Sequence, residues 1–299
     1  MKFNGNTAWY IPNMNNNRSS SYPITKLWDQ DFTYCFRFKV DWETMVVPRR
    51  KEMLETNEWK VGGIVVRNGA HFGMNTVVGI DETGEMLKAL EATIWITNSE
   101  NPVNPSIEDM DYMDNSKTEC LSIKIDSKTS KTYHPDKGEK DGMTDTINWD
   151  GWINCVFVSE YNKRLILYVD DFKDTLYYDG TLLDYSLSWL WVGCCNGFSG
   201  IDMDNDYFTG EISHLGLFQK CLTKDERKLF FENLNDLSVL NNYNMNPVAM
   251  TDFKKKTPYK IYDLSENGNH LTVYKEKSME PMYDIQNEVQ DQTSNRPTE

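Results

Sequence analysis

Apolar and polar residues alternate along several segments of the chain. In residues 32–40, aromatic or branched side chains stand at every second position, and mostly polar ones stand between them. Leu165, Leu167 and Val169 repeat this spacing after a polar turn at residues 160–163. Successive side chains of a β-strand point to opposite faces, so a period of two gives each segment one apolar face. The pattern predicts paired antiparallel strands.

The pattern changes from a strand to a helix within residues 207–234. Residues 208–213 alternate between apolar and polar positions, which predicts a half-buried strand. Thr223 stands three residues before Glu226, the spacing of a capping box in which each side chain satisfies a backbone donor of the other. Apolar residues then follow at helical spacing, which predicts a short helix near residues 224–234.

Five segments resemble, in order, strands of the laminin-G-like domains in the concanavalin A-like family. They are FNGNTAWYI (3–11), FTYCFRFKV (32–40), the hairpin 149–170, LWVGC (190–194) and the strand and helix at 207–234. The resemblance implies an all-β fold, a two-sheet antiparallel jelly-roll sandwich with one short C-terminal helix and an extended tail. Another antiparallel sandwich with the same alternation stays open as an alternative.

We expect a sandwich domain at residues 1–235 and a C-terminal extension at residues 236–299. Within the extension, IYDLSENGNHL (261–271) resembles the phrase that opens a laminin-G-like domain, although Glu266 replaces the usual glycine. In a circularly permuted chain, the strand at residues 261–274 packs back beside the first strand, which is the interpretation we favour. Alternatively, it begins a second module or adds to a neighbouring subunit.

Composition excludes several classes of partner. The chain has 299 residues and a formal net charge of -15, which argues against nucleic acid and anionic membranes. It contains no apolar run long enough for a transmembrane helix, and its first residues lack the apolar core of a secretory signal. Its six cysteines include no C-x-x-C pair, so we expect reduced, mostly buried thiols.

The sequence gives little support for catalytic residues. The E-x-D-x-x-E strand motif of laminarinase-type enzymes has only a partial counterpart, in which Glu139 and Asp141 are followed by Thr144. This triplet lies in a polar loop rather than on an alternating strand, so the carboxyl pair of a glycosidase is not expected there. None of the four histidines, His71, His134, His214 and His270, stands in a nucleophile motif. The sequence predicts a protein that is not an enzyme.

Two kinds of binding site remain as candidates. Asp202, Asp204 and Asp206 place oxygen ligands at alternate positions, which suits Ca²⁺, the one cofactor considered; a plain acidic loop is the alternative. Sugar recognition needs aromatic platforms near loops, and four tryptophans fall near predicted strand ends. They are Trp9, Trp28, Trp59 and Trp149.

The resemblance also suggests a setting for the protein. Laminin-G-like modules work outside cells or in bacteriophage virions, and the absence of a signal favours a virion released by lysis. We expect a non-enzymatic virion structural protein, in a homo-oligomer or docked on other virion proteins, with a cell-surface glycan as a further partner. The alternative is an extracellular or cellular carbohydrate-binding lectin, and a glycoside hydrolase or lyase comes third.

Overall fold

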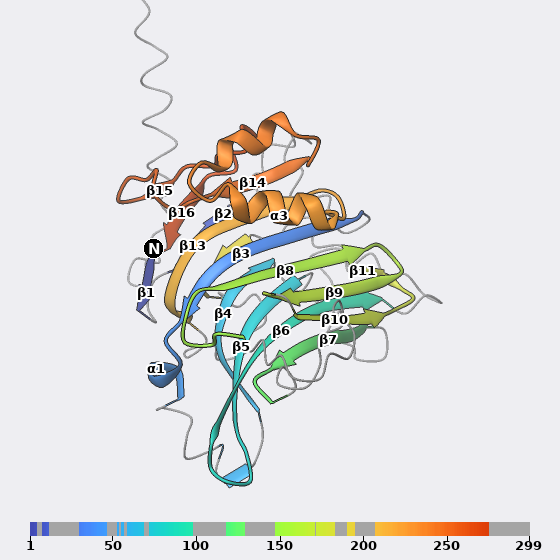
Figure 1. Ribbon diagram of the computed structural model, residues 1–299, viewed down its shortest axis with the longest axis vertical. Coiled ribbons are helices and arrows are strands. Elements are labelled where there is room, and N and C mark those ends of the chain that lie inside the picture. Colours follow the sequence, from blue (N-terminus) through green and yellow to red (C-terminus); the bar gives the residue numbers. More distant parts are fainter. Residues whose placement is uncertain are drawn as a thin grey trace, which may run out of the picture.

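The computed structural model consists of two antiparallel sheets packed face to face (Figure 1). The structure describes residues 1–4, 8–11, 30–46, 53, 55–56, 59–68, 72–97, 118–128, 147–170, 172–182, 190–194 and 207–274. The expected two-sheet antiparallel β-sandwich is therefore confirmed. Among the described residues, no helix is long and apolar enough to span a membrane.

The first sheet is built around the long strand that the sequence indicated most clearly. Its order is β1 (Lys2–Asn4), β13 (Thr209–Phe218), β3 (Phe32–Val40), β8 (Ile153–Glu160), β9 (Arg164–Val169) and β10 (Phe172–Tyr177), and β14 (Pro247–Thr251) also pairs with β13. The inner face of β3 carries the alternating aromatic residues, of which Tyr34 and Phe36 stack at a centroid distance of 5.7 Å.

The second sheet joins segments from both ends of the chain. Its order is β11 (Thr181–Leu182), β6 (Met86–Thr97), β5 (Phe72–Ile80), β4 (Lys60–Asn68), β12 (Leu190–Val192), β2 (Ala8–Ile11), β16 (Leu271–Tyr274) and β15 (Lys260–Ile261), with β7 (Thr118–Asp126) paired to β6. Phe72 of β5 reaches across the core and stacks on Tyr34, with a centroid distance of 4.4 Å. Contacts of this kind hold the two sheets together.

Helices cover the edge and the outer face of the first sheet. The short helix α1 (Trp42–Val46) follows β3, while α3 (Lys224–Glu232) and the 3-10 helix η5 (Leu237–Asn242) follow β13. The predicted capping box begins α3: Thr223 Oγ1 accepts from the Glu226 amide, and the Glu226 carboxylate accepts from the Thr223 amide. The expectation of one short C-terminal helix is met by α3.

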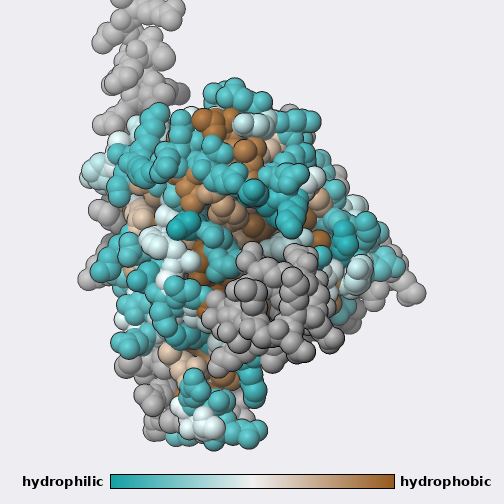
Figure 2. Space-filling model, viewed as in Figure 1, coloured by the Kyte–Doolittle hydropathy of each residue, from teal (hydrophilic) through white to brown (hydrophobic). Residues whose placement is uncertain are grey.

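A second apolar cluster lies beneath α3. Phe230 of the helix meets Phe218 of β13 edge to face, with ring centroids 5.9 Å apart. Leu237 and Leu240 of η5 and Val156 of β8 belong to the same cluster. Figure 2 shows hydrophobic residues on this side of the molecule, framed by hydrophilic ones. The helix therefore covers the outer face of the sheet by burying an apolar stripe.

The C-terminal strand lies in the chain's own second sheet. β16 pairs with β2 in the register Thr272–Tyr10, Val273–Trp9 and Tyr274–Ala8, and Leu271 is part of the main core. Sequentially distant ends of the described chain thus form neighbouring strands (Figure 1). The division of the chain into residues 1–235 and 236–299 stays a prediction.

The described cysteines are all free thiols. Cys35, Cys155 and Cys194 are buried, and burial raises the pKa of the Cys35 and Cys155 thiols. Cys221 is half-buried, whereas Cys120 is exposed on β7. The expectation of buried thiols therefore holds for Cys35, Cys155 and Cys194. Cys120 departs from this expectation because its side chain points away from the core.

Candidate functional site

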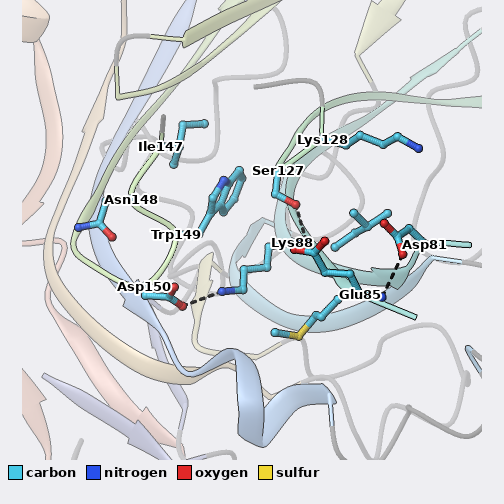
Figure 3. Close-up of a pocket in the computed structure, with 11 residues that line it drawn as sticks. Asp81, Glu85, Lys88, Ser127, Lys128, Ile147, Asn148, Trp149 and Asp150 are labelled. Atoms are coloured by element: carbon cyan, nitrogen blue, oxygen red, sulfur yellow. Dashed lines mark hydrogen bonds and ion pairs between the residues drawn. The ribbon is translucent and has the colours of Figure 1, made fainter. Parts of the chain in front are cut away.

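A cavity of about 530 Å³ lies where three loops meet at one end of the sandwich. Its walls are Asp81 and residues 85–88 from the β5–β6 hairpin, residues 127–128 after β7, and residues 147–150 before β8. Figure 3 shows charged and polar side chains around the cavity together with the ring of Trp149.

The hairpin wall is fixed by Asp81. Its Oδ1 accepts hydrogen bonds from the Thr83 amide at 2.9 Å, the Thr83 hydroxyl at 2.6 Å and the Glu85 amide at 2.9 Å. These bonds stabilise the carboxylate, and the bond from the Thr83 hydroxyl is the largest cause of the lowered pKa of Asp81. Asp81 is thus an ionised group that shapes the turn.

An ion pair crosses the cavity between distant segments. Lys88 Nζ of β6 lies 2.7 Å from Asp150 Oδ1 in the loop before β8. The Lys88 side chain is 16% exposed, whereas that of Asp150 is 79% exposed, so the carboxylate faces solvent and a ligand can reach it. Ser127 Oγ accepts from the Lys88 amide at 3.1 Å, which joins the third wall to the same strand.

Trp149 lies between the cavity and the core. The residue is 8% exposed, and its ring meets that of Trp42 edge to face at a centroid distance of 5.8 Å. Trp42 Nε1 donates a 2.6 Å hydrogen bond to the Trp149 carbonyl oxygen. The Gly151 amide closes the turn by donating to the Asn148 carbonyl at 3.0 Å, which leaves Asn148 exposed at the rim.

The arrangement supplies hydrogen-bonding groups beside an aromatic ring. Lys88 donates, Asp150 accepts, and Ser127 and the Asn148 amide do both. Within the described ranges, no cluster of three His, Cys, Asp or Glu side chains could hold a metal ion. His214 and His270 lie elsewhere: His214 Nε2 is 2.8 Å from the Leu234 carbonyl, and His270 Nδ1 accepts from the Asp263 amide.

The four tryptophans predicted as sugar platforms have different positions. Trp149 lines the cavity. Trp9 is 3% exposed in β2, which corrects its expected role as a surface platform, because the strand turns its ring into the core. Trp59 is half-buried against Gly79, with Lys124 Nζ 4.1 Å from its ring centroid.

Several predicted residues lie outside the described part of the chain. They are Trp28, the candidate calcium ligands Asp202, Asp204 and Asp206, and the loop carboxylates Glu139 and Asp141. Their proposed roles stay predictions.

Sequence reasoning missed the polar residues of the cavity. Lys88 and Asp150 are 62 positions apart, and Lys88 and Ser127 are 39 apart. Only the register of β6 with β7 and the turn before β8 bring them together. The one local signal was the phrase NWDG at 148–151, in which an amide and a carboxylate flank a tryptophan.

Neither the family models nor the curated proteins contain a match to this chain. Among solved structures, the chain is similar to a Bacteroides ovatus protein described as carbohydrate-binding, with 11% identity, a TM-score of 0.43, and coverage of 93% of this chain and 61% of that chain. It is also similar to the binding domain of Paraclostridial Mosquitocidal Protein 1, with 12% identity and a TM-score of 0.32 over 70% of this chain and 38% of that one.

A further similar structure is the binding domain of botulinum neurotoxin DC in complex with rat synaptotagmin II. It shares 9% identity at a TM-score of 0.36, over 72% of this chain and 38% of that chain. The present chain spans less than two thirds of the length of each of these three chains. Similarity this distant transfers no ligand and no activity.

Proposed function

We propose that this protein is a non-enzymatic, lectin-like β-sandwich that binds a glycan in the cavity beside Trp149. The observation that carries the proposal is the meeting of an aromatic ring with the Lys88–Asp150 pair, Ser127 and Asn148 around one cavity. Sugar rings present apolar C–H faces that pack on aromatic rings, and hydroxyls that both donate and accept hydrogen bonds. The cavity offers polar groups for the hydroxyls, and for an apolar face it offers the small exposed part of Trp149, a residue that is 8% exposed.

The Lys88–Asp150 pair suits hydroxyl recognition. A sugar hydroxyl beside the ion pair would accept from one of the remaining ammonium hydrogens and donate to the carboxylate. Hydrogen bonds to charged groups are stronger than those between neutral groups. The pair comes from two different walls, so a bound sugar would contact both loops. Since Trp42 and the Asn148–Gly151 turn hold Trp149 in place, little ordering is required when a ligand binds.

The cavity does not favour glycoside hydrolysis. A glycosidase needs one carboxylic acid held protonated by a raised pKa, with a second carboxylate across the bond to be cleaved. The pKa of Asp81 is instead lowered, and its Oδ1 is bonded within the turn. Asp150 is paired with a lysine. These features support a binding role over an enzymatic one.

The glycan-binding role is tested at the polar residues of the cavity, because Trp149 also belongs to the core. We expect purified protein on a glycan array to bind a defined set of sugars, and Asp150→Ala and Lys88→Met to weaken that binding at least tenfold. Glu232→Gln, an exposed carboxylate on α3, is the matched control and should bind like the unmodified chain. Unchanged binding in both cavity variants, with melting temperatures preserved, would overturn the assignment of the cavity.

The proposed setting is a virion, with the protein as a capsid decoration, fibre or tail component. The family resemblance of the five strand segments supports this setting. Partners would then be copies of the same chain or other virion proteins, together with a host glycan. Mass spectrometry of purified virions tests the setting separately from the glycan array: a protein that binds glycans and is absent from virions would be a cellular or extracellular lectin.

A further inference from the structure

A second cluster with recognition chemistry lies on the outer face of the first sheet. Arg37 stands on β3, Asn154 faces it on β8, and Trp152 immediately precedes β8. Figure 1 shows β3 and β8 side by side in this sheet. None of the three residues lines the cavity beside Trp149, although Trp152 stands only three positions further along the chain.

Trp152 is more exposed than the other tryptophans whose side chains the structure describes. Its residue surface is 38% exposed, whereas Trp42 and Trp191 are 3% and 7% exposed. The Arg37 guanidinium carbon lies 5.8 Å from the Trp152 ring centroid, within the range of a cation–π contact. The indole therefore offers solvent an apolar surface that has a positive charge at its border.

Arg37 is held in place without being neutralised. Its Nη1 donates to Asn154 Oδ1 at 3.3 Å, and a neutral amide leaves the guanidinium charge uncompensated. Among the described residues, no carboxylate forms an ion pair with Arg37, although the chain has a net charge of -15. The Asp170 carboxylate accepts a hydrogen bond from the backbone amide of Asn154. An arginine fork suits a carboxylate, which it binds through two parallel hydrogen bonds.

The surroundings favour a ring-shaped ligand over a peptide strand. β3 is paired on both sides, with β13 and β8, and β8 is paired with β3 and β9. Their backbone donors and acceptors are thus engaged, and no free edge is present here to accept an added strand. Recognition has to come from side chains that stand on the sheet, as the Trp152 ring and the Arg37 fork do.

We propose that Trp152 and Arg37 form a second binding site, for a sugar ring that carries a carboxylate. The pyranose packs on the exposed indole face, and its carboxylate is bound by the guanidinium, which Asn154 positions. This site goes beyond the cavity proposed above, because it selects acidic sugars and uses none of the cavity residues.

The test is isothermal titration calorimetry of the full chain with two acidic sugars, an oligogalacturonate and sialyllactose. Each acidic sugar is compared with its neutral counterpart. At least one of the acidic sugars should bind, and its neutral counterpart should bind at least tenfold more weakly. Loss of hydrogen bonds to a charged group corresponds to about tenfold to a hundredfold in affinity, so Arg37→Gln should weaken binding by that factor. Trp152→Ala should weaken it at least as much, and added salt should weaken the unmodified chain.

Two matched controls come from the same sheet. Lys173→Gln removes a cation that lies 5.8 Å from the Tyr168 ring centroid, and Tyr177→Ala removes an aromatic residue that is 70% exposed. Both should bind the acidic sugar like the unmodified chain. The proposal is overturned if neither acidic sugar binds, if neutral and acidic sugars bind equally, or if folded Arg37→Gln and Trp152→Ala retain full affinity. Loss of binding in Asp150→Ala alone would assign the acidic sugar to the cavity instead.

Discussion

The indole nitrogen of Trp42 donates a buried hydrogen bond of 2.6 Å to the backbone carbonyl of Trp149. The bond joins helix α1, which follows β3, to the loop that forms one wall of the cavity. A side chain 107 positions away thus fixes the backbone of Trp149, and the edge-to-face contact of the two rings supports the same geometry. The position of the cavity wall therefore depends on the core.

This relationship predicts the effect of Trp42→Phe. The variant keeps an aromatic ring but leaves the Trp149 carbonyl without its donor, which costs about 1–3 kcal/mol when the group is buried. We expect the free energy of unfolding in urea to fall by that amount and glycan binding in the cavity to weaken. Trp152→Phe is the control, because it changes an exposed tryptophan and should alter stability by less than about 0.5 kcal/mol. Equal stability of both variants would show that the hydrogen bond is unimportant.

Local patterns carried most of what the sequence could predict. The capping box of Thr223 and Glu226 depends on residues three positions apart, and the alternation in β3 on residues two apart, so both were visible in the sequence. The reason for Gly210 is not local: its φ is +151°, and a β-carbon there would collide with the carbonyl oxygen of Lys39 on the neighbouring strand β3. A period of two, however, does not tell which strands are neighbours.

The cavity could not be predicted for the same reason. The Lys88–Asp150 pair exists because β6 and the loop before β8 meet in space, and neither segment carries a motif for the other. The sequence indicates Trp149 as a candidate sugar platform only through its residue type and its position near a strand end. Trp9 also lies near a predicted strand end and is buried, because its position in β2 turns its ring into the core.

The two described histidines predict how stability depends on pH. Burial lowers the pKa of His214 and of His270. The positive charge of Lys254 lowers the pKa of His214 further, and that of Lys260 lowers the pKa of His270. The unfolded chain, with histidine pKa values of about 6.5, therefore binds these protons more readily than the folded chain. Stability is fully present above about pH 6.5 and is lost as the pH falls toward the lower folded-state values.

Urea unfolding at pH 7.5, 6.0 and 5.0 measures this dependence. The free energy of unfolding should decrease across the series, and His214→Gln should be less stable at pH 7.5 because the contact with the Leu234 carbonyl changes. In the same variant, the free energy of unfolding should decrease less between pH 7.5 and pH 5.0, since only one of the two histidines remains to bind a proton. A slope that His214→Gln leaves unchanged would assign the pH dependence to other groups.

Leu271→Ala tests whether the C-terminal strand belongs to the core in solution. Leu271 is 1% exposed and begins β16, which pairs with β2 in the second sheet. Removing a buried leucine side chain typically costs about 2–5 kcal/mol, a large share of the typical stability of about 5–15 kcal/mol. We expect a loss of that size in urea unfolding. The neighbouring Thr272→Ala should cost much less, and a small loss in both variants would place this strand outside the core, free to pair with a neighbouring subunit.

Glu266 offers a change that should stabilise the protein. It is an exposed residue with φ +67° in the loop between β15 and β16, where Asp263 accepts hydrogen bonds from the Ser265 and Asn269 amides and so fixes the turn. A left-handed backbone costs a residue with a β-carbon about 1–2 kcal/mol, whereas glycine adopts it freely.

Glu266→Gly should therefore stabilise the chain, although glycine also gives the unfolded state more freedom, which offsets about 0.4–1 kcal/mol. The net gain should lie between about 0 and about 1.5 kcal/mol, measured as a higher urea midpoint with an unchanged slope. Glu266→Ala is the matched control: it removes the same charge and keeps the β-carbon, so it should gain nothing from backbone relief. If the alanine variant is stabilised as much as the glycine variant, the gain comes from the lost negative charge in this acidic chain, and not from the backbone.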